Sequence, residues 1–195
     1  MVTSGTLVLP AGRVGREGDA PVGAAAAAAR GRGEALALGL REDGVGAVVV
    51  RLAPSVHDGV RRGFAGALVD AAERTGVAAY VGDGQQRWPA VHRRDVADLY
   101  AAAIGGAPAG TVLHGVAEHG VRMREVAELI GHRFGLPTRS IDAADATTHF
   151  GWVGSFVATD SPASSAATRA LLGWDPRGPG LVEDMAAGFF SGGAR

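Results

Sequence analysis

Apolar runs and helical spacings alternate along the first part of the chain. The run Thr6-Leu7-Val8-Leu9, which ends at Pro10, predicts a short buried strand. The Ala- and Leu-rich segment 22–42 predicts a helix that stops at Gly44. The continuous β-branched run 47–52 is typical of a strand covered on both faces in a parallel sheet. Strand, long helix and buried strand in this order predict a right-handed βαβ crossover.

Shorter elements follow, and helices dominate toward the C-terminus. The spacing of apolar residues predicts helices over 63–75, 95–104 and 122–134 and strands over 78–81 and 111–114. Asp95 is expected to cap the second of these helices. The rest reads as helical segments broken by prolines, with a core of Phe150, Trp152, Phe156, Leu171, Leu172, Trp174, Leu181 and Phe189. The pattern therefore predicts an α/β fold in which a sheet-bearing part carries a smaller, mostly helical lobe.

Composition excludes several kinds of chemistry. The chain has 195 residues, of which 47% are hydrophobic and 20% charged, with a net charge of −1. Because it contains neither Cys nor Lys, it has no disulfide, no thiolate zinc site and no Walker A or Schiff-base lysine. The balanced charge argues against nucleic acid as a partner. Neither a membrane-spanning run nor a signal peptide is recognisable, so we expect the cytoplasm and no membrane partner.

Three local motifs point to chemistry but lack the context that it needs. The segment 114–119 resembles a metalloprotease motif, yet three residues rather than two separate the first His from the Glu, so we predict no metal site. Gly154-Ser155-Phe156 is an incomplete nucleophile elbow. The glycine-rich segments 12–18 and 105–106 are interpreted as plain loops, because neither has the strand before it and the helix after it that aim backbone amides at a phosphate.

Four segments, in order and spacing, resemble the extended branch of the short-chain dehydrogenase/reductase family, which includes NAD-dependent epimerases and dehydratases. These are Val2-Thr3-Ser4-Gly5-Thr6, the run 48–54 that ends in Ala53-Pro54, the segment Trp88 to Ala97, and Arg124 to Ile130. The likeness covers nearly the whole chain but only the later part of that fold. It implies a partial Rossmann-type parallel sheet flanked by helices, with the helical lobe as the substrate lobe. We expect one incomplete α/β domain over 1–195, with the sheet in 1–80 and 88–115 and the lobe in 116–195.

The resemblance also implies site residues. Ser4 matches the family's catalytic Ser or Thr at a strand end, where open α/β sheets bind ligands, although a plain loop hydroxyl is equally expected. Aligning Glu34 with the acidic residue one turn after the family's Tyr-x-x-x-Lys pair places Arg30 at the lysine and Ala26 at the tyrosine. Arg30 can bind a ribose, but it stays protonated and is no base. Pro54 lies in the loop that borders the cofactor.

Other residues complete the predicted site. His57 follows that loop and has a suitable pKa for proton transfer, so it is a candidate to replace the missing tyrosine, with a structural histidine as the alternative. Arg87, His92 and Arg93 lie in a segment that contacts substrate in relatives. The aromatic residues of the last third are interpreted as lobe core.

Two functions remain open. The first is an NAD(P)-dependent oxidoreductase or epimerase/dehydratase-like enzyme, cut or started at an internal Met, that acts on a small carbonyl or hydroxyl substrate. Its family implies NAD or NADP, although tight binding to this chain is not expected because the nucleotide-binding half is missing from it. The second is a catalytically silent binding or regulatory protein. A homodimer through the 22–42 helix is expected from relatives. The sequence does not specify the substrate, the choice of cofactor or the oligomer.

Overall fold

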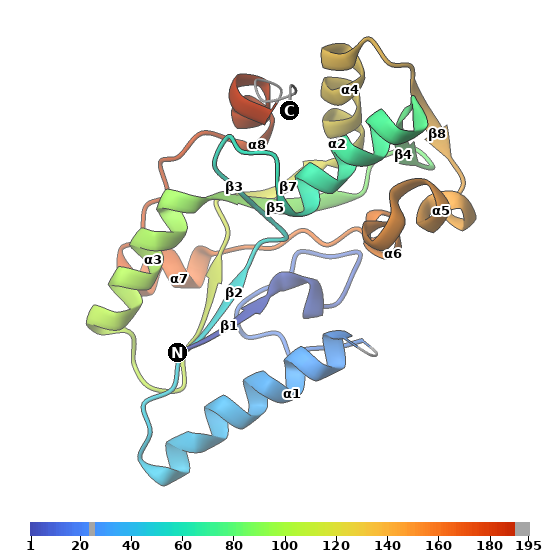
Figure 1. The fold of residues 1–195 in the computed structure, drawn as a ribbon. Coiled ribbons are helices and arrows are strands. Elements are labelled where there is room, and N and C mark those ends of the chain that lie inside the picture. The colour runs from blue at the N-terminus through green and yellow to red at the C-terminus, as the bar shows by residue number, and fades with distance from the viewer. Residues whose placement is uncertain (24–25, 190–195) are drawn as a thin grey trace.

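Strands β1 (Val2–Gly5), β2 (Val49–Leu52) and β6 (Val112–Gly115) form a parallel three-stranded sheet (Figure 1). The computed structural model describes residues 1–23 and 26–189. The strands lie in the order β1-β2-β6, and both pairs are parallel. Helix α1 (Ala26–Gly39) connects β1 to β2 and packs beside both strands. The predicted parallel pairing of the first strand with the 47–52 run is therefore confirmed.

The first strand begins and ends earlier than its apolar run predicts. β1 covers Val2–Gly5, whereas Thr6–Val8 forms a short 3₁₀ helix. Gly5 pairs with Leu52, the last residue of β2, so no neighbouring strand remains to bond a continued β1. The chain instead turns over the end of the sheet and buries Thr6 and Val8. The prediction of a strand over 6–9 was wrong for this reason.

Two smaller sheets complete the strand architecture. Strands β3 (Ser55–His57) and β5 (Arg87–His92) are parallel, and β7 (Glu118–Arg122) pairs antiparallel with β5. Strands β4 (Ala78–Val81) and β8 (Thr138–Ile141) form a separate parallel pair. β3, β7 and β8 lack β-branched apolar runs, and their sequence pattern did not predict them.

Helices surround these sheets and confirm most of the sequence pattern. Helix α2 (Gly63–Thr75) has the predicted bounds, and α3 (Arg93–Gly106) and α4 (Met123–Phe134) differ from theirs by a few residues. The C-terminal third holds the short helices α5 (Ala146–Phe150), α6 (Gly154–Val157), α7 (Ala166–Leu172) and α8 (Leu181–Asp184), then a π-helical turn, Met185–Phe189. The fold is thus α/β, with parallel sheets flanked by helices as predicted.

Asp95 does not cap α3. The helix begins at Arg93, and its N-cap is His92, whose Nδ1 accepts a hydrogen bond from the Arg94 amide. The Asp95 carboxylate is buried and accepts hydrogen bonds from the backbone amides of Arg177 and Gly178. Asp95 therefore fastens a distant C-terminal loop to α3, a contact that local sequence spacing does not reveal.

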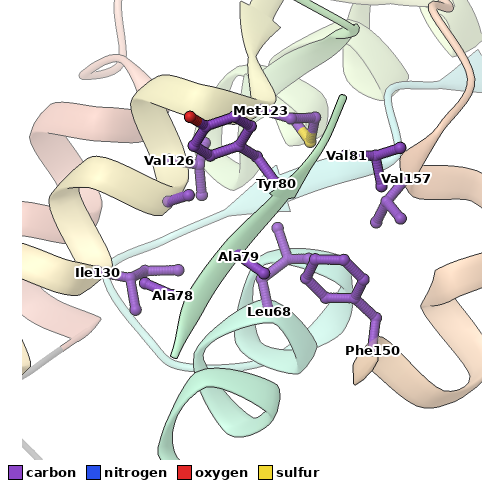
Figure 2. Close-up of a pocket in the computed structure, with 11 residues that line it drawn as sticks. Leu68, Ala78, Ala79, Tyr80, Val81, Met123, Val126, Ile130, Phe150 and Val157 are labelled. Atoms are coloured by element: carbon purple, nitrogen blue, oxygen red, sulfur yellow. The ribbon is translucent and has the colours of Figure 1, made fainter. Parts of the chain in front are cut away.

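The core around β4 is closely packed. Side chains from α2, α4 and α5 converge on this strand, among them Leu68, Ile130 and Phe150 (Figure 2). The gap between them measures about 10 Å³, and every residue that lines it except Tyr80 has an apolar side chain. A space of this size holds one water molecule at most, so this gap is a packing defect and not a ligand site.

Helix α1 leaves apolar side chains in solvent. Leu36 and Leu40 are 74% and 44% exposed, respectively, and they border a shallow groove with Gly39. The homodimer through this helix stays a prediction. Within the described residues, no helix is both long and apolar enough to cross a bilayer.

The buried His114 makes stability depend on pH. Its Nδ1 donates to the Ser164 carbonyl at 2.7 Å, and burial lowers the pKa of His114 below its ordinary value. As the pH falls, His114 in the unfolded chain therefore binds a proton at a higher pH than in the folded protein. The free energy of unfolding decreases below about pH 6.5 and stops decreasing once the pH lies below the folded-state pKa. Burial also lowers the pKa of His149. We expect acidification to reduce the free energy of unfolding between about pH 7.5 and 5.5.

The variant His114→Gln keeps a donor for the Ser164 carbonyl and removes the titrating group. It should lose less stability over this interval than the parent protein in urea denaturation, although His149 leaves part of the effect in place. Equal losses in the two proteins would exclude His114 as a cause.

Candidate functional site

A cavity of about 480 Å³ lies at the carboxyl ends of β1 and β2. Its volume is in the range of small-molecule sites. We name it the aromatic cavity, and its lining residues are Thr3, Ser4, Gly5, Thr6, Leu7, Val8, Ala27, Arg30, Leu52, Ala53, Pro54, Val56, Phe64, Trp152 and Phe156. Three residues that the sequence predicted separately, Ser4, Arg30 and Pro54, therefore line one cavity.

The lining of the aromatic cavity includes polar residues. The Ser4 and Thr6 hydroxyls are buried, and neither has a hydrogen-bond partner. Buried polar groups are usually paired, but these oxygens expose almost no surface, so a ligand in the cavity pairs with them only if the side chains turn toward it. Arg30 is exposed and, within the described part of the chain, its guanidinium has no ion pair. It is also the one charged residue among the described lining.

A buried ion pair fixes helix α1 to strand β2. The Arg51 guanidinium binds both Glu34 carboxylate oxygens, with an Nη2–Oε2 distance of 2.7 Å, and each side chain is at most 3% exposed. The same guanidinium donates to the carbonyls of Glu17 and Asp19. Because Arg30 precedes Glu34 by one helical turn, this pair also sets where Arg30 stands relative to β1.

Three aromatic side chains also line the cavity. Phe64 contacts Trp152 and Phe156 edge to face, with ring centroids 4.9 and 5.7 Å apart. Phe64 also contacts Trp88 at 5.3 Å, and Trp88 is completely buried. We name Phe64, Trp152 and Phe156 the aromatic wall. Its residues come from α2 and from the segment around α6, so no local motif could have revealed it.

The prediction that the late aromatic residues are all core was wrong in part. Phe150 and Trp174 are buried, but Trp152 is 60% exposed and lies on the cavity. Leu171 is also exposed, whereas Leu181 is buried. The side chain of Phe189 lies outside the described part of the structure.

The structure places His57 away from the cavity. Successive residues of a strand point to opposite sides, and Val56 lines the cavity, so His57 faces the other side. Its Nδ1 lies 2.7 Å from the Asp184 carboxylate, and its Nε2 is buried without a partner. This geometry supports the structural alternative over a role as general acid.

The three residues predicted to bind substrate are separated. Arg87 lines a second hollow, which we name the polar cavity, of about 480 Å³, together with Asp83, Gln85, Gln86, Arg122, Ala158 and Asp160. Arg87 forms a two-point ion pair with Asp160, and this hydrogen bond lowers the pKa of the Asp160 carboxyl. His92 is buried against the His57 ring, and Arg93 pairs with Asp58 at the surface.

The aromatic cavity fits the nicotinamide side of a dinucleotide better than its phosphates. Arg30 carries an exposed guanidinium of the kind that binds ribose hydroxyls, and the lining also holds the unpaired but buried hydroxyls of Ser4 and Thr6. In the glycine-rich loop, however, the Gly12 and Gly15 amides donate to the carbonyls of Asp160 and Pro162. Those amides are therefore not free to bind a pyrophosphate. The side chain of Ala26, aligned with the family's tyrosine, lies outside the described part of the structure.

Comparison with known sequences finds relatives of undetermined function. No family model matches the chain. An uncharacterized protein of Schizosaccharomyces pombe is 42% identical over 144 residues, which cover 74% of this chain and 49% of that protein. An uncharacterized protein of Saccharomyces cerevisiae is 38% identical over 189 residues, which cover 97% of this chain and 63% of that protein. The chain thus spans less than two thirds of the length of either relative.

Solved structures share the fold. A dTDP-glucose 4,6-dehydratase from Streptomyces venezuelae with bound NAD superposes with a TM-score of 0.72 at 16% identity, covering 95% of this chain and 56% of the enzyme. MoeE5 in complex with UDP-glucuronic acid and NAD gives 0.71 at 23% identity, covering 96% and 62%, respectively. A UDP-galactose 4-epimerase gives 0.67 at 21% identity, covering 95% and 60%.

These likenesses define the class of fold. Over about 95% of its length the chain has the Rossmann-like fold of NAD-dependent epimerases and dehydratases, as the sequence resemblance predicted. The dehydratase and MoeE5 structures contain NAD, and another neighbour, RMD from Pseudomonas aeruginosa, is complexed with NADPH. Identities below 25% establish the shared fold.

Proposed function

We propose that the chain forms the substrate side of an NAD(P)-dependent oxidoreductase or epimerase/dehydratase-like enzyme. The observation that carries this proposal is the aromatic cavity at the carboxyl end of a parallel sheet, whose lining includes Ser4 and Thr6, with unpaired hydroxyls, and the exposed Arg30. Ligands of open α/β sheets bind at this end. The substrate is a small carbonyl or hydroxyl compound.

The residues of the cavity have separate tasks in this reaction. A nicotinamide cofactor would supply or accept a hydride when bound. The Ser4 side chain turns its hydroxyl into the cavity and donates a hydrogen bond to the substrate oxygen, which orients the carbonyl group, and the Arg30 guanidinium holds the ribose hydroxyls. Pro54 shapes the adjoining wall. Arginine stays protonated, so the proton that a product hydroxyl needs comes from water through Ser4.

A silent binding protein is the second candidate function. Ala26 and Arg30 occupy the positions aligned with the family's tyrosine and lysine. Among the described residues that line the cavity, Arg30 is the one with an acidic or basic side chain. A protein of this kind would bind the same ligands without hydride transfer. Turnover separates the two candidates.

The test is oxidation of NADH or NADPH by the full chain with a panel of small ketones. Cofactor is supplied at millimolar concentration, because the amides of the glycine-rich loop are occupied and we expect weak cofactor binding. Ser4→Ala should lower kcat/KM by about tenfold, the effect of one lost hydrogen bond of roughly 1.4 kcal/mol. The control Ser140→Ala changes an exposed hydroxyl on β8 and should leave the rate unchanged.

Two results would count against the enzyme. The absence of cofactor oxidation with every ketone would favour the silent protein. Equal loss of rate in Ser4→Ala and Ser140→Ala would show that Ser4 has no specific role in the reaction.

A further inference from the structure

The lining of the aromatic cavity is selective in its chemistry. Apart from Arg30 and the small hydroxyls, its described lining is apolar, and it includes no carboxylate. Aliphatic side chains such as Leu7, Val8 and Val56 face the same space as the aromatic wall. A ligand that fills this space replaces water beside apolar surface, which favours an apolar ligand body.

Ring contacts connect the aromatic wall to the core. Phe64 is in contact with Trp152 and Phe156 on the cavity and with the buried Trp88 behind it. Trp88 is itself fastened, because its indole N–H donates to the Thr159 carbonyl. A wall of preorganised rings binds a flat aromatic ligand well, since each aromatic pair gains free energy beyond simple burial and little ordering is required.

The charged side chains that line the aromatic and polar cavities do not suit the binding of a diphosphate. Arg30 is the one cation in the aromatic cavity lining. In the polar cavity, Arg87 is paired with Asp160 and Arg122 with Glu125. A diphosphate needs several unpaired cations, and among these three arginines only Arg30 has no ion pair within the described residues.

We propose that the aromatic cavity takes a flat, uncharged aromatic ketone or alcohol, seated against Phe64, Trp152 and Phe156 with its oxygen toward Ser4, and that nucleoside-diphosphate sugars are not its ligands. This inference rests on the proposed function for the choice of a carbonyl or hydroxyl group. The ring preference stands on the geometry of the wall alone.

Equilibrium dialysis of the full 195-residue chain without cofactor tests the proposal. The probes are 2-acetylnaphthalene, its saturated counterpart 2-acetyldecalin, and UDP-glucose. We expect the naphthyl ketone to bind at least about tenfold more tightly than UDP-glucose and severalfold more tightly than the decalin. Tighter binding of UDP-glucose, equal binding of the two ketones, or no binding of the naphthyl ketone would each overturn the proposal.

Variants of Trp152 separate ring contact from bulk. Trp152→Leu keeps an apolar side chain without a ring and should weaken naphthyl ketone binding by about tenfold, whereas Trp152→Phe should stay within about twofold of the parent. Ile104→Ala, a change at a side chain that is 79% exposed on α3, is the control and should have no effect. Equal weakening by Trp152→Leu and Trp152→Phe, or none by either, would remove Trp152 from the binding surface.

This readout is independent of turnover. If the naphthyl ketone binds but no ketone oxidises NADPH, the proposed enzyme fails and the ligand class stands. If UDP-glucose is turned over and the naphthyl ketone does not bind, the ligand class fails and the enzyme stands.

Discussion

Glu34→Gln should lower the free energy of unfolding by about 3–5 kcal/mol. The reason is that Arg51 remains buried and charged when its carboxylate partner is gone. Arg51 also holds the carbonyls of Glu17 and Asp19, so the loop that those residues belong to should loosen as well. Urea denaturation followed by circular dichroism measures the effect.

A surface pair gives the matched control. Arg124 and Glu128 form an i,i+4 ion pair on α4 with both side chains about half exposed. Glu128→Gln should change stability by less than about 0.5 kcal/mol, because solvent screens such pairs. Removing both buried charges with Arg51→Met in Glu34→Gln should recover part of the loss, since no unpaired charge remains. A loss below about 1 kcal/mol in Glu34→Gln would contradict the role that we assign to the pair.

Trp88→Ala should cost about 3–5 kcal/mol, the usual range for emptying a large aromatic site. Trp88 has no exposed surface and its indole N–H is bonded to the Thr159 carbonyl at 3.2 Å. The change leaves a cavity behind Phe64, so the aromatic wall loses its support. Thermal and urea unfolding of the purified variant measure the loss.

Trp152→Ala is the comparison for this prediction. Both changes remove an indole that contacts Phe64, but Trp152 is 60% exposed. We expect it to cost less than about 1 kcal/mol, because most of its surface is already in water. Similar losses for the two variants would mean that burial does not distinguish these tryptophans.

Local pattern predicted the elements whose own residues stabilise them. Helix α2 has its predicted bounds because apolar spacing runs up to a glycine that closes it, Gly76, with a φ of +71°. The β-branched run 47–52 predicted strand β2. β7 and β8 were missed because polar residues dominate them, and the strands that pair with them are distant in sequence. Such strands depend on partners that no local window contains.

Some residues of the candidate site were likewise identified from the sequence, and others only from the structure. The resemblance identified Ser4, Arg30 and Pro54, and the structure places all three on one cavity. It identified His57 as well, but strand alternation turns that side chain to the opposite side of β3 from Val56. Thr6, which shares the unpaired environment of Ser4, was passed over because its segment was read as a strand. The aromatic wall carried no signal beyond ordinary core spacing.

By itself the sequence determined the α/β class and the parallel pairing of the first strand with β2, because hydrophobic periodicity and glycine stops act over a few residues, and the family resemblance supplied the strand end that bears Ser4. Only the tertiary structure decided which side chains share a cavity, which arginines are already paired and which tryptophan faces solvent. Those properties arise when segments far apart along the chain pack together, and packing depends on the three-dimensional neighbours of each residue rather than on its neighbours in sequence.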